Sequence, residues 1–164
     1  MFECCTDCTG ELIINPGGDD EGFMETSLHT PAWCALDLAT LWAGAETRGG
    51  NVTVPGAIGT RAQRRRIDET EYTIYMGING KRDKDGVYVS DPLTQLYTNI
   101  AYLRENVVDP PTDLSPTRSA ELTLPDGSTT LNAEIQVTGF QLGNRVGPLA
   151  VAVLKIMIPL GRFT

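Results

Sequence analysis

The sequence has few of the residues that enzymes use for acid–base and nucleophilic catalysis. Its 164 residues include one histidine, His29, so any triad-like site would depend on that single imidazole. No serine or cysteine stands in a Gly-x-Ser-x-Gly turn. The glycine-rich stretch 49–59 lacks the Lys-Ser or Lys-Thr pair of a phosphate-binding loop. We therefore expect that the protein is not an enzyme.

Basic residues and long apolar runs are also scarce. Thirteen Lys and Arg face 21 Asp and Glu, which gives a net charge of -8 and a pI near 4.6. A nucleic-acid binder needs a basic surface that displaces counterions from phosphates, so nonspecific binding of DNA or RNA is not expected. The sequence has no run of eighteen apolar residues and no signal-peptide pattern at its start. We predict a soluble protein made in a cytoplasm, with no membrane partner.

The four cysteines are Cys4, Cys5, Cys8 and Cys34. In a cytoplasm, free thiols or metal ligands are more common than a disulfide framework. Cys5 and Cys8 have the C-x-x-C spacing, and His29 with Cys34 could complete a zinc site. In the alternative interpretation, Cys34 is a small buried apolar residue and the other three are exposed thiols. No cofactor is favoured, and a zinc-stabilised binding module remains the alternative to the function considered below.

One segment has a clear helical pattern. In DPLTQLYTNIAYLRENVVDPP the apolar residues recur every three or four positions, which places them on one helical face. Asp91 is suited to the N-cap, Pro92 to the first helical position, and Pro110 with Pro111 to the stop. The pattern predicts an amphipathic helix over about residues 91–108.

The remaining periodic segments have strand character. These are the runs at 12–14, 64–79, 119–127, 128–143 and 149–163, and Asp126-Gly127 is a hairpin signal. The last run is apolar at nearly every position from Leu149 to Leu160, as in a strand covered on both faces. The expected fold class is α+β, mainly β: a β-sandwich or barrel with one amphipathic helix packed against it.

Three stretches have more than one interpretation. Residues 28–59 are apolar but cut by glycine and proline, which indicates a long apolar loop. The run 83–86, Asp-Lys-Asp-Gly, resembles the opening of a calcium loop, but the twelfth position is Thr94 instead of glutamate, so a hairpin turn is expected. Arg64, Arg65 and Arg66 could form an anion patch; we interpret them as a strand start that pairs with acids across a sheet or a subunit contact.

The order of several short motifs is more informative than any one of them. LHTPAWxxLDLxxLW, RGG, VPGAIG, RRR, a strand, a helix ending YLRENVV, AELTLPDGS and IPLGRF follow one another along the chain. This order resembles the minor tail proteins of long-tailed phages that infect actinobacteria. It is also similar to the N-terminal ring domain of the distal tail protein family, which has a tail-tube-like fold. The resemblance covers residues 28–164 as a single ring-forming domain and leaves 1–27 as a cysteine-rich, acidic N-terminal arm.

The resemblance implies a structural protein of the virion tail, assembled in the host cytoplasm. Such proteins form rings, usually hexameric, that join the tail tube to the host-recognition tip or baseplate hub and line the DNA channel. The implied partners are further copies of the chain, the tail tube protein, the tip or baseplate proteins, and DNA that passes without specific binding. The family has no catalytic residues to transfer.

Two sets of residues follow from this hypothesis. Apolar side chains of the long loop are candidates for a subunit contact, because buried aromatic anchors dominate interface energies; the alternative is that they pack on the subunit's own sheet. These candidates are Trp33, Leu36, Leu38, Leu41 and Trp42. Acidic residues on strands are candidates for the channel wall, where they would repel DNA at short range. These are Asp68, Glu69, Glu71, Glu121 and Glu134.

Overall fold

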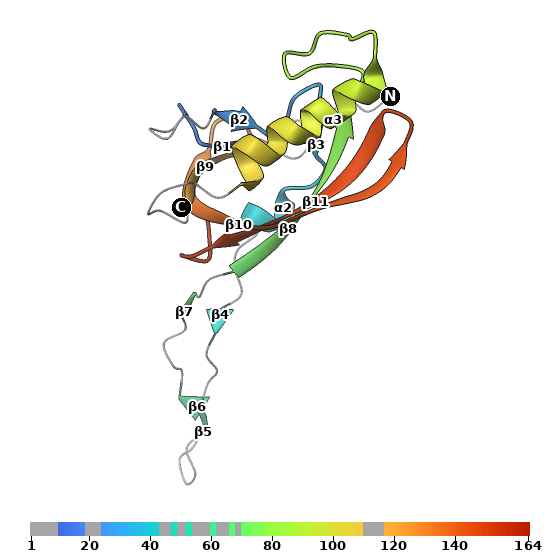
Figure 1. Cartoon of the computed structure of the whole chain (residues 1–164). Helices are drawn as coiled ribbons and strands as arrows, with labels where there is room; N and C mark the ends of the chain where they lie inside the picture. Colours follow the sequence, from blue (N-terminus) through green and yellow to red (C-terminus); the bar gives the residue numbers. More distant parts are fainter. Residues whose placement is uncertain are drawn as a thin grey trace.

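The computed structural model describes residues 10–18, 24–42, 47–48, 52–53, 60–61, 66–67, 70–109 and 117–164 (Figure 1). Its elements, in chain order, are β1 (Glu11–Ile14), β2 (Thr26–Ser27), β3 (Trp33–Ala35), α2 (Ala39–Trp42), β4 (Thr47–Arg48), β5 (Val52–Thr53), β6 (Thr60–Arg61), β7 (Arg66–Ile67), β8 (Thr70–Asn79), α3 (Pro92–Leu103), η1 (Arg104–Val108), β9 (Arg118–Thr123), β10 (Thr130–Val146) and β11 (Leu149–Ile158).

Seven of these strands form one antiparallel sheet in the order β2-β1-β9-β10-β11-β8-β3. The long strand β10 holds the sheet together, because its residues 130–135 pair with β9 and its residues 136–146 pair with β11. The turn between β9 and β10 is the one that Asp126 and Gly127 predict. There the Asp126 carboxylate accepts hydrogen bonds from the backbone N–H groups of Ser128 and Thr129. The predicted class, mainly β with one long helix, is confirmed.

The helix begins and ends where the sequence indicates. The Asp91 side chain caps its first turn by accepting hydrogen bonds from the Thr94 backbone N–H (3.2 Å) and the Thr94 hydroxyl (2.7 Å). After Leu103 the chain continues as the π-helical turn η1 to Val108, so the two elements together match the predicted span. No helix within the described part of the chain has the length and apolar character needed to cross a lipid bilayer.

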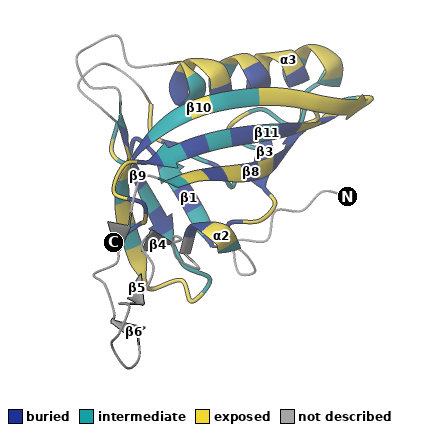
Figure 2. Ribbon diagram, turned by 90° about the horizontal axis from the view of Figure 1, so that it is seen from below, coloured by how far each residue is buried: buried dark blue, intermediate teal, exposed yellow. Residues whose placement is uncertain are grey.

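The helix packs on one face of the sheet, which we call the inner face. Strand β11 places Ala152, Leu154, Ile156 and Ile158 on this face, and all are almost completely buried (Figure 2). Gly80, at the end of β8, permits the close approach of the helix, since a Cβ there would overlap the Pro92 carbonyl oxygen. The core therefore lies on the inner face, where the helix, the segment that carries Leu28, Leu38 and Leu41, and Phe163 contribute to it.

The opposite face, here called the outer face, carries the alternate residues of the same strands. Burial in β11 alternates along the strand, so the expectation that this apolar run is covered on both faces is wrong for the folded subunit. The reason is that α3 covers one side of the sheet, and no described element packs across the other as a second layer.

The start of the chain belongs to the same folded unit. Leu12 of β1 pairs with Leu122 of β9, and Ile13 pairs with Ser27 of β2. The short strand that the sequence predicts at 12–14 is therefore confirmed, and it lies inside the main sheet. Leu12 and Ile14, within the stretch 1–27 that the sequence assigned to an arm, belong to the same buried core as the apolar residues of β8 and β11. Residues 1–9 lie outside the described part.

Candidate interaction surface on the outer face

The outer face divides into an acidic half and an apolar half. The acidic half consists of the four glutamates of the seven-stranded sheet: Glu11 of β1, Glu71 of β8, Glu121 of β9 and Glu134 of β10. Their neighbours in the register show that they share one face. Ile13 and Asn132 flank Glu121, and Ser119 lies opposite Glu134. All four side chains point away from the core, and they come from three separate parts of the sequence: β1, β8 and the β9–β10 hairpin.

Hydrogen bonds fix the positions of three of these carboxylates. Glu11 accepts from the Ser27 hydroxyl (2.6 Å), Glu134 from the Ser119 hydroxyl (2.8 Å) and Glu71 from the Thr138 hydroxyl (2.9 Å). Hydroxyl donors orient a carboxylate without removing its charge. Among the described residues, the ion pair at this surface is Lys155 with Glu71, at 3.7 Å between Nζ and Oε1. The acidic half therefore keeps most of its negative charge.

The apolar half lies at the other end of the same face. Tyr75 is 53% exposed, Val151 43%, Leu36 42% and Leu149 38%. They are neighbours in space, because the Leu36 N–H donates to the Tyr75 carbonyl (2.8 Å) and β11 runs directly beside β8. Large apolar side chains gathered on one surface are typical of a contact site with another protein. We call this set the apolar patch.

Most of the residues predicted for a subunit contact lie outside the apolar patch. Trp33 is 3% exposed, stacks on Tyr102 of α3 at 5.5 Å between ring centroids and donates its indole N–H to the Ser27 carbonyl. Leu38 and Leu41 are also buried in the subunit's own core. The structure thus supports the alternative interpretation for these three residues. Leu36 is the predicted residue that reaches the apolar patch, and the side chain of Trp42 lies outside the description.

Some of the acidic residues predicted for the channel wall lie together on one face of the sheet. Glu71, Glu121 and Glu134 lie on the outer face, whereas Asp68 and Glu69 fall outside the described residues. Sequence reasoning missed Glu11. The alternation in the run Glu-Leu-Ile-Ile was the available signal, since two buried apolar residues at 12 and 14 put positions 11 and 13 on the other face.

Of the four residues considered as zinc ligands, the structure describes His29 and Cys34. Cys34 is disulfide-bonded, so the prediction of a free thiol or metal ligand is wrong for this residue. A disulfide sulfur is not the thiolate that zinc requires. His29 forms a β-bridge with Cys34, and burial lowers the pKa of its imidazole. Cys4, Cys5 and Cys8 are outside the described residues. Among those that are described, no three His, Cys, Asp or Glu side chains cluster as metal ligands.

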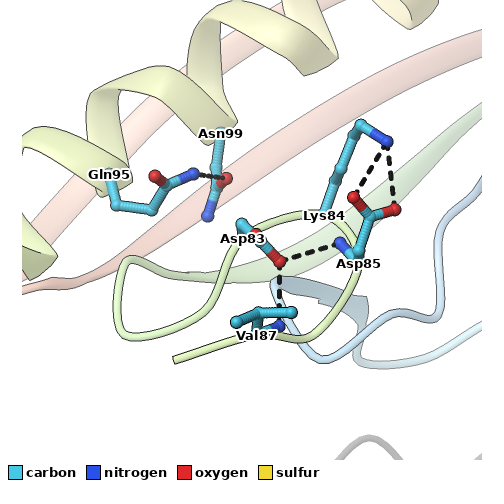
Figure 3. Close-up of polar contacts among 6 residues, drawn as sticks. All are labelled: Asp83, Lys84, Asp85, Val87, Gln95 and Asn99. Atoms are coloured by element: carbon cyan, nitrogen blue, oxygen red, sulfur yellow. Dashed lines mark hydrogen bonds and ion pairs between the residues drawn. The ribbon is translucent and has the colours of Figure 1, made fainter. Parts of the chain in front are cut away.

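The loop that resembles a calcium site is a turn. The Asp83 carboxylate accepts hydrogen bonds from the backbone N–H groups of Asp85 (3.0 Å) and Val87 (2.8 Å), as Figure 3 shows. Lys84 contacts Asp85 at 3.0 Å, and this contact raises the lysine pKa. These contacts use the carboxylates to close the loop, as expected for a turn.

The same loop is anchored to the helix by a buried amide. Asn99 of α3 donates from Nδ2 to the carbonyls of Asn79 (2.8 Å) and Arg82 (3.0 Å), while its Oδ1 accepts from Gln95 (2.8 Å). The Gln95 contact is drawn in Figure 3. This network fixes the loop as part of the scaffold, and it leaves the outer face as the candidate functional surface.

Comparison with known proteins does not assign the chain to a family: no protein-family model matches it, and no curated protein matches it in sequence.

Proposed function

We propose that the protein is a structural subunit of a long-tailed phage, a distal tail or minor tail protein that forms a ring at the end of the tail tube. In this proposal the ring, which we expect to be hexameric, joins the tube to the host-recognition tip and lines the DNA channel. The confirmed fold class is compatible with the tail-tube-like domain that the sequence motifs resemble.

The observation that carries the proposal is the segregation of the sheet's acids. Glu11, Glu71, Glu121 and Glu134 all lie on the outer face, and the fully buried apolar side chains of the same strands, such as Leu12, Ile74 and Ile135, lie on the inner face. A channel that conducts DNA must not bind it, and a repeated carboxylate surface repels phosphates within about a Debye length, roughly 8 Å at physiological salt. The acidic half is suited to that wall.

The apolar patch supports self-association. A single copy leaves Leu36, Tyr75, Leu149 and Val151 between 38% and 53% exposed, and contact with a neighbouring copy would remove this surface from water. Heterologous contact between identical subunits closes a ring when the rotation permits it. The patch and the acidic half share one sheet face, so one subunit orientation can bury the first and present the second to the lumen.

The test is negative-stain electron microscopy of the purified protein at high concentration, with mass photometry on the same sample. We expect closed rings with a central hole. In reconstructions of these rings, the outer-face glutamates should lie at the hole. Monomers at every concentration, or rings whose hole is lined by the helix, would contradict the proposal.

A further inference from the structure

Strand β10 has a second edge that the subunit leaves open. Residues 130–135 of β10 pair with β9, and this ladder ends at Ile135, opposite Arg118, where β9 begins. Residues 136–146 pair with β11 on one side only, and Figure 1 shows this part of the β10–β11 hairpin extending beyond β9. Within the described part of the chain, no strand or backbone hydrogen bond occupies their other side, which we call the open edge. Its backbone groups are available to a further strand.

The open edge has few of the features that protect an edge strand from pairing. It contains no proline and no lysine, and Arg145 is its one charged residue. Two β-bulges interrupt its pairing with β11, between Val137 and Gly139 and between Leu142 and Arg145. Bulges twist an edge and hinder a straight strand from pairing along its full length. A partner strand must therefore match the short regular stretch 139–142 and the bulges on both sides of it.

The sequence of this stretch reads nearly the same in both directions. Residues 138–144 are Thr-Gly-Phe-Gln-Leu-Gly-Asn, so an apolar residue, a glycine and a polar residue follow in turn on either side of the central Gln141. In an antiparallel pair of two copies centred on Gln141, Phe140 would lie directly opposite Leu142 of the second copy, and the two glycines would lie opposite each other. A two-fold contact has this property, because residue i contacts j and j contacts i.

The side chains at this stretch also suit such a pair. Phe140 and Leu142 both lie on the inner face, since they are opposite Leu154 and Ala152 of β11. Leu142 is 50% exposed, although it is a large apolar side chain on the face that holds the core. Contact with Phe140 of a second copy would remove part of this surface from water.

We propose that the open edges of two copies pair with each other, antiparallel and about a two-fold axis at Gln141. The pair would join the two seven-stranded sheets into one continuous sheet. Residues directly opposite each other in a sheet share a face, so the outer faces of the two copies would stay on the same side. The contact uses neither the apolar patch nor the acidic half, and it does not depend on the proposed ring.

The experiment gives the residue at the axis opposite charges in two variants. Gln141 is exposed, so Gln141→Lys and Gln141→Glu should both fold, which far-UV circular dichroism and urea unfolding verify. Each variant alone places like charges against each other, and we expect its pairing to weaken by at least about fivefold. An equimolar mixture of the two variants places opposite charges at the axis and should restore pairing to within about twofold of wild type.

The matched control is Thr130→Lys. Thr130 is exposed on the same strand but lies in the part that pairs with β9, so its pairing should stay within about twofold of wild type. Lys155, opposite Gly139, lies beside Gln141 on the outer face and would favour the glutamate variant and oppose the lysine variant. Weakening in both variants would therefore report contact between the two Gln141 positions.

Two readouts locate the contact and separate it from the proposed function. Sedimentation velocity measures pairing, and hydrogen exchange of amides 136–146 should slow in the wild type as the protein concentration rises. Unchanged exchange at every concentration would overturn the edge contact, and so would wild-type pairing in both variants or a mixture that pairs as weakly as each variant alone. Closed rings with unchanged exchange at 136–146 would refute the edge contact and leave the proposed function intact. Slowed exchange without rings would do the reverse.

Discussion

The two faces of strand β11 have similar residues but different surroundings. Its inner side chains, Ala152, Leu154, Ile156 and Ile158, are buried in the core, while Leu149 and Val151 on the outer side are 38% and 43% exposed. An apolar run with this composition normally belongs to a strand covered on both faces. The subunit supplies one cover, and in the proposed ring a neighbouring copy would supply the second.

The largest expected effect is on the free energy of unfolding, and it should differ between the two faces of β11. Leu154→Ala removes a fully buried side chain from the inner face and should cost about 2 to 5 kcal/mol of unfolding free energy. Val151→Ala, three positions earlier on the outer face, should cost less than about 1 kcal/mol in the isolated subunit. Urea unfolding of both variants at low protein concentration measures the difference. Equal losses would mean that the outer face is already covered within the subunit.

The next largest effect is expected at Asn99, whose side chain anchors the loop after β8 to the helix. Asn99→Ala leaves the carbonyls of Asn79 and Arg82 without the amide donor, and we expect a loss of about 1 to 3 kcal/mol. Gln95→Ala is the control, because it removes only the donor to the Asn99 oxygen at a less buried position, and it should cost under about 1 kcal/mol. Thermal and urea unfolding report both changes. A greater loss for the Gln95 variant would contradict this assignment of the network.

The apolar patch should affect assembly more than folding. Tyr75→Ser removes its most exposed aromatic ring, and we expect the free energy of unfolding of the monomer to change by less than about 1 kcal/mol. Assembly should weaken at least about tenfold, since interface tyrosines often contribute 1.4 kcal/mol or more. Sedimentation velocity measures the association. Tyr97→Ser is the control, because Tyr97 is 55% exposed on α3, outside the patch. If both variants weakened assembly equally, a specific role of the apolar patch in assembly would be contradicted.

The smallest effect is a pH dependence at a site on neither face. Hydrogen bonds from the Thr129 side chain and from the backbone N–H groups of Thr129 and Ser128 lower the pKa of Asp126 from 3.8 to about 2. The lowered pKa means that this contribution to stability is complete above about pH 4 and is lost as the pH falls through about 2. Asp126→Asn should flatten the wild-type loss of stability over this range, as measured by urea unfolding at pH 5, 4, 3 and 2. An unchanged slope in the variant would assign the acid sensitivity to other carboxylates.

The candidate surface was predictable only in part. The alternation within β8 and β10 exposes Glu71 and Glu134 by simple periodicity, and these glutamates were expected on strand surfaces. The apolar patch could not be predicted, because Leu36 and Tyr75 become neighbours through a contact between residues far apart in the sequence. Trp33 illustrates the opposite case. Its large aromatic side chain is suited to an interface, yet the ring is buried and stacks on Tyr102 of the helix.

The local elements follow from short stretches of the amino-acid sequence. The Asp91 cap with its following proline fixed the start of the helix, and Asp126 with Gly127 fixed the β9–β10 turn, because both depend on backbone groups only a few residues away. The division of the apolar side chains into core and surface comes from the tertiary structure, which also places Glu11, opposite Thr123, on the same sheet face as Glu121 and Glu134. These results depend on long-range strand pairing and on the side of the sheet that the helix covers, neither of which is encoded in any short stretch of residues.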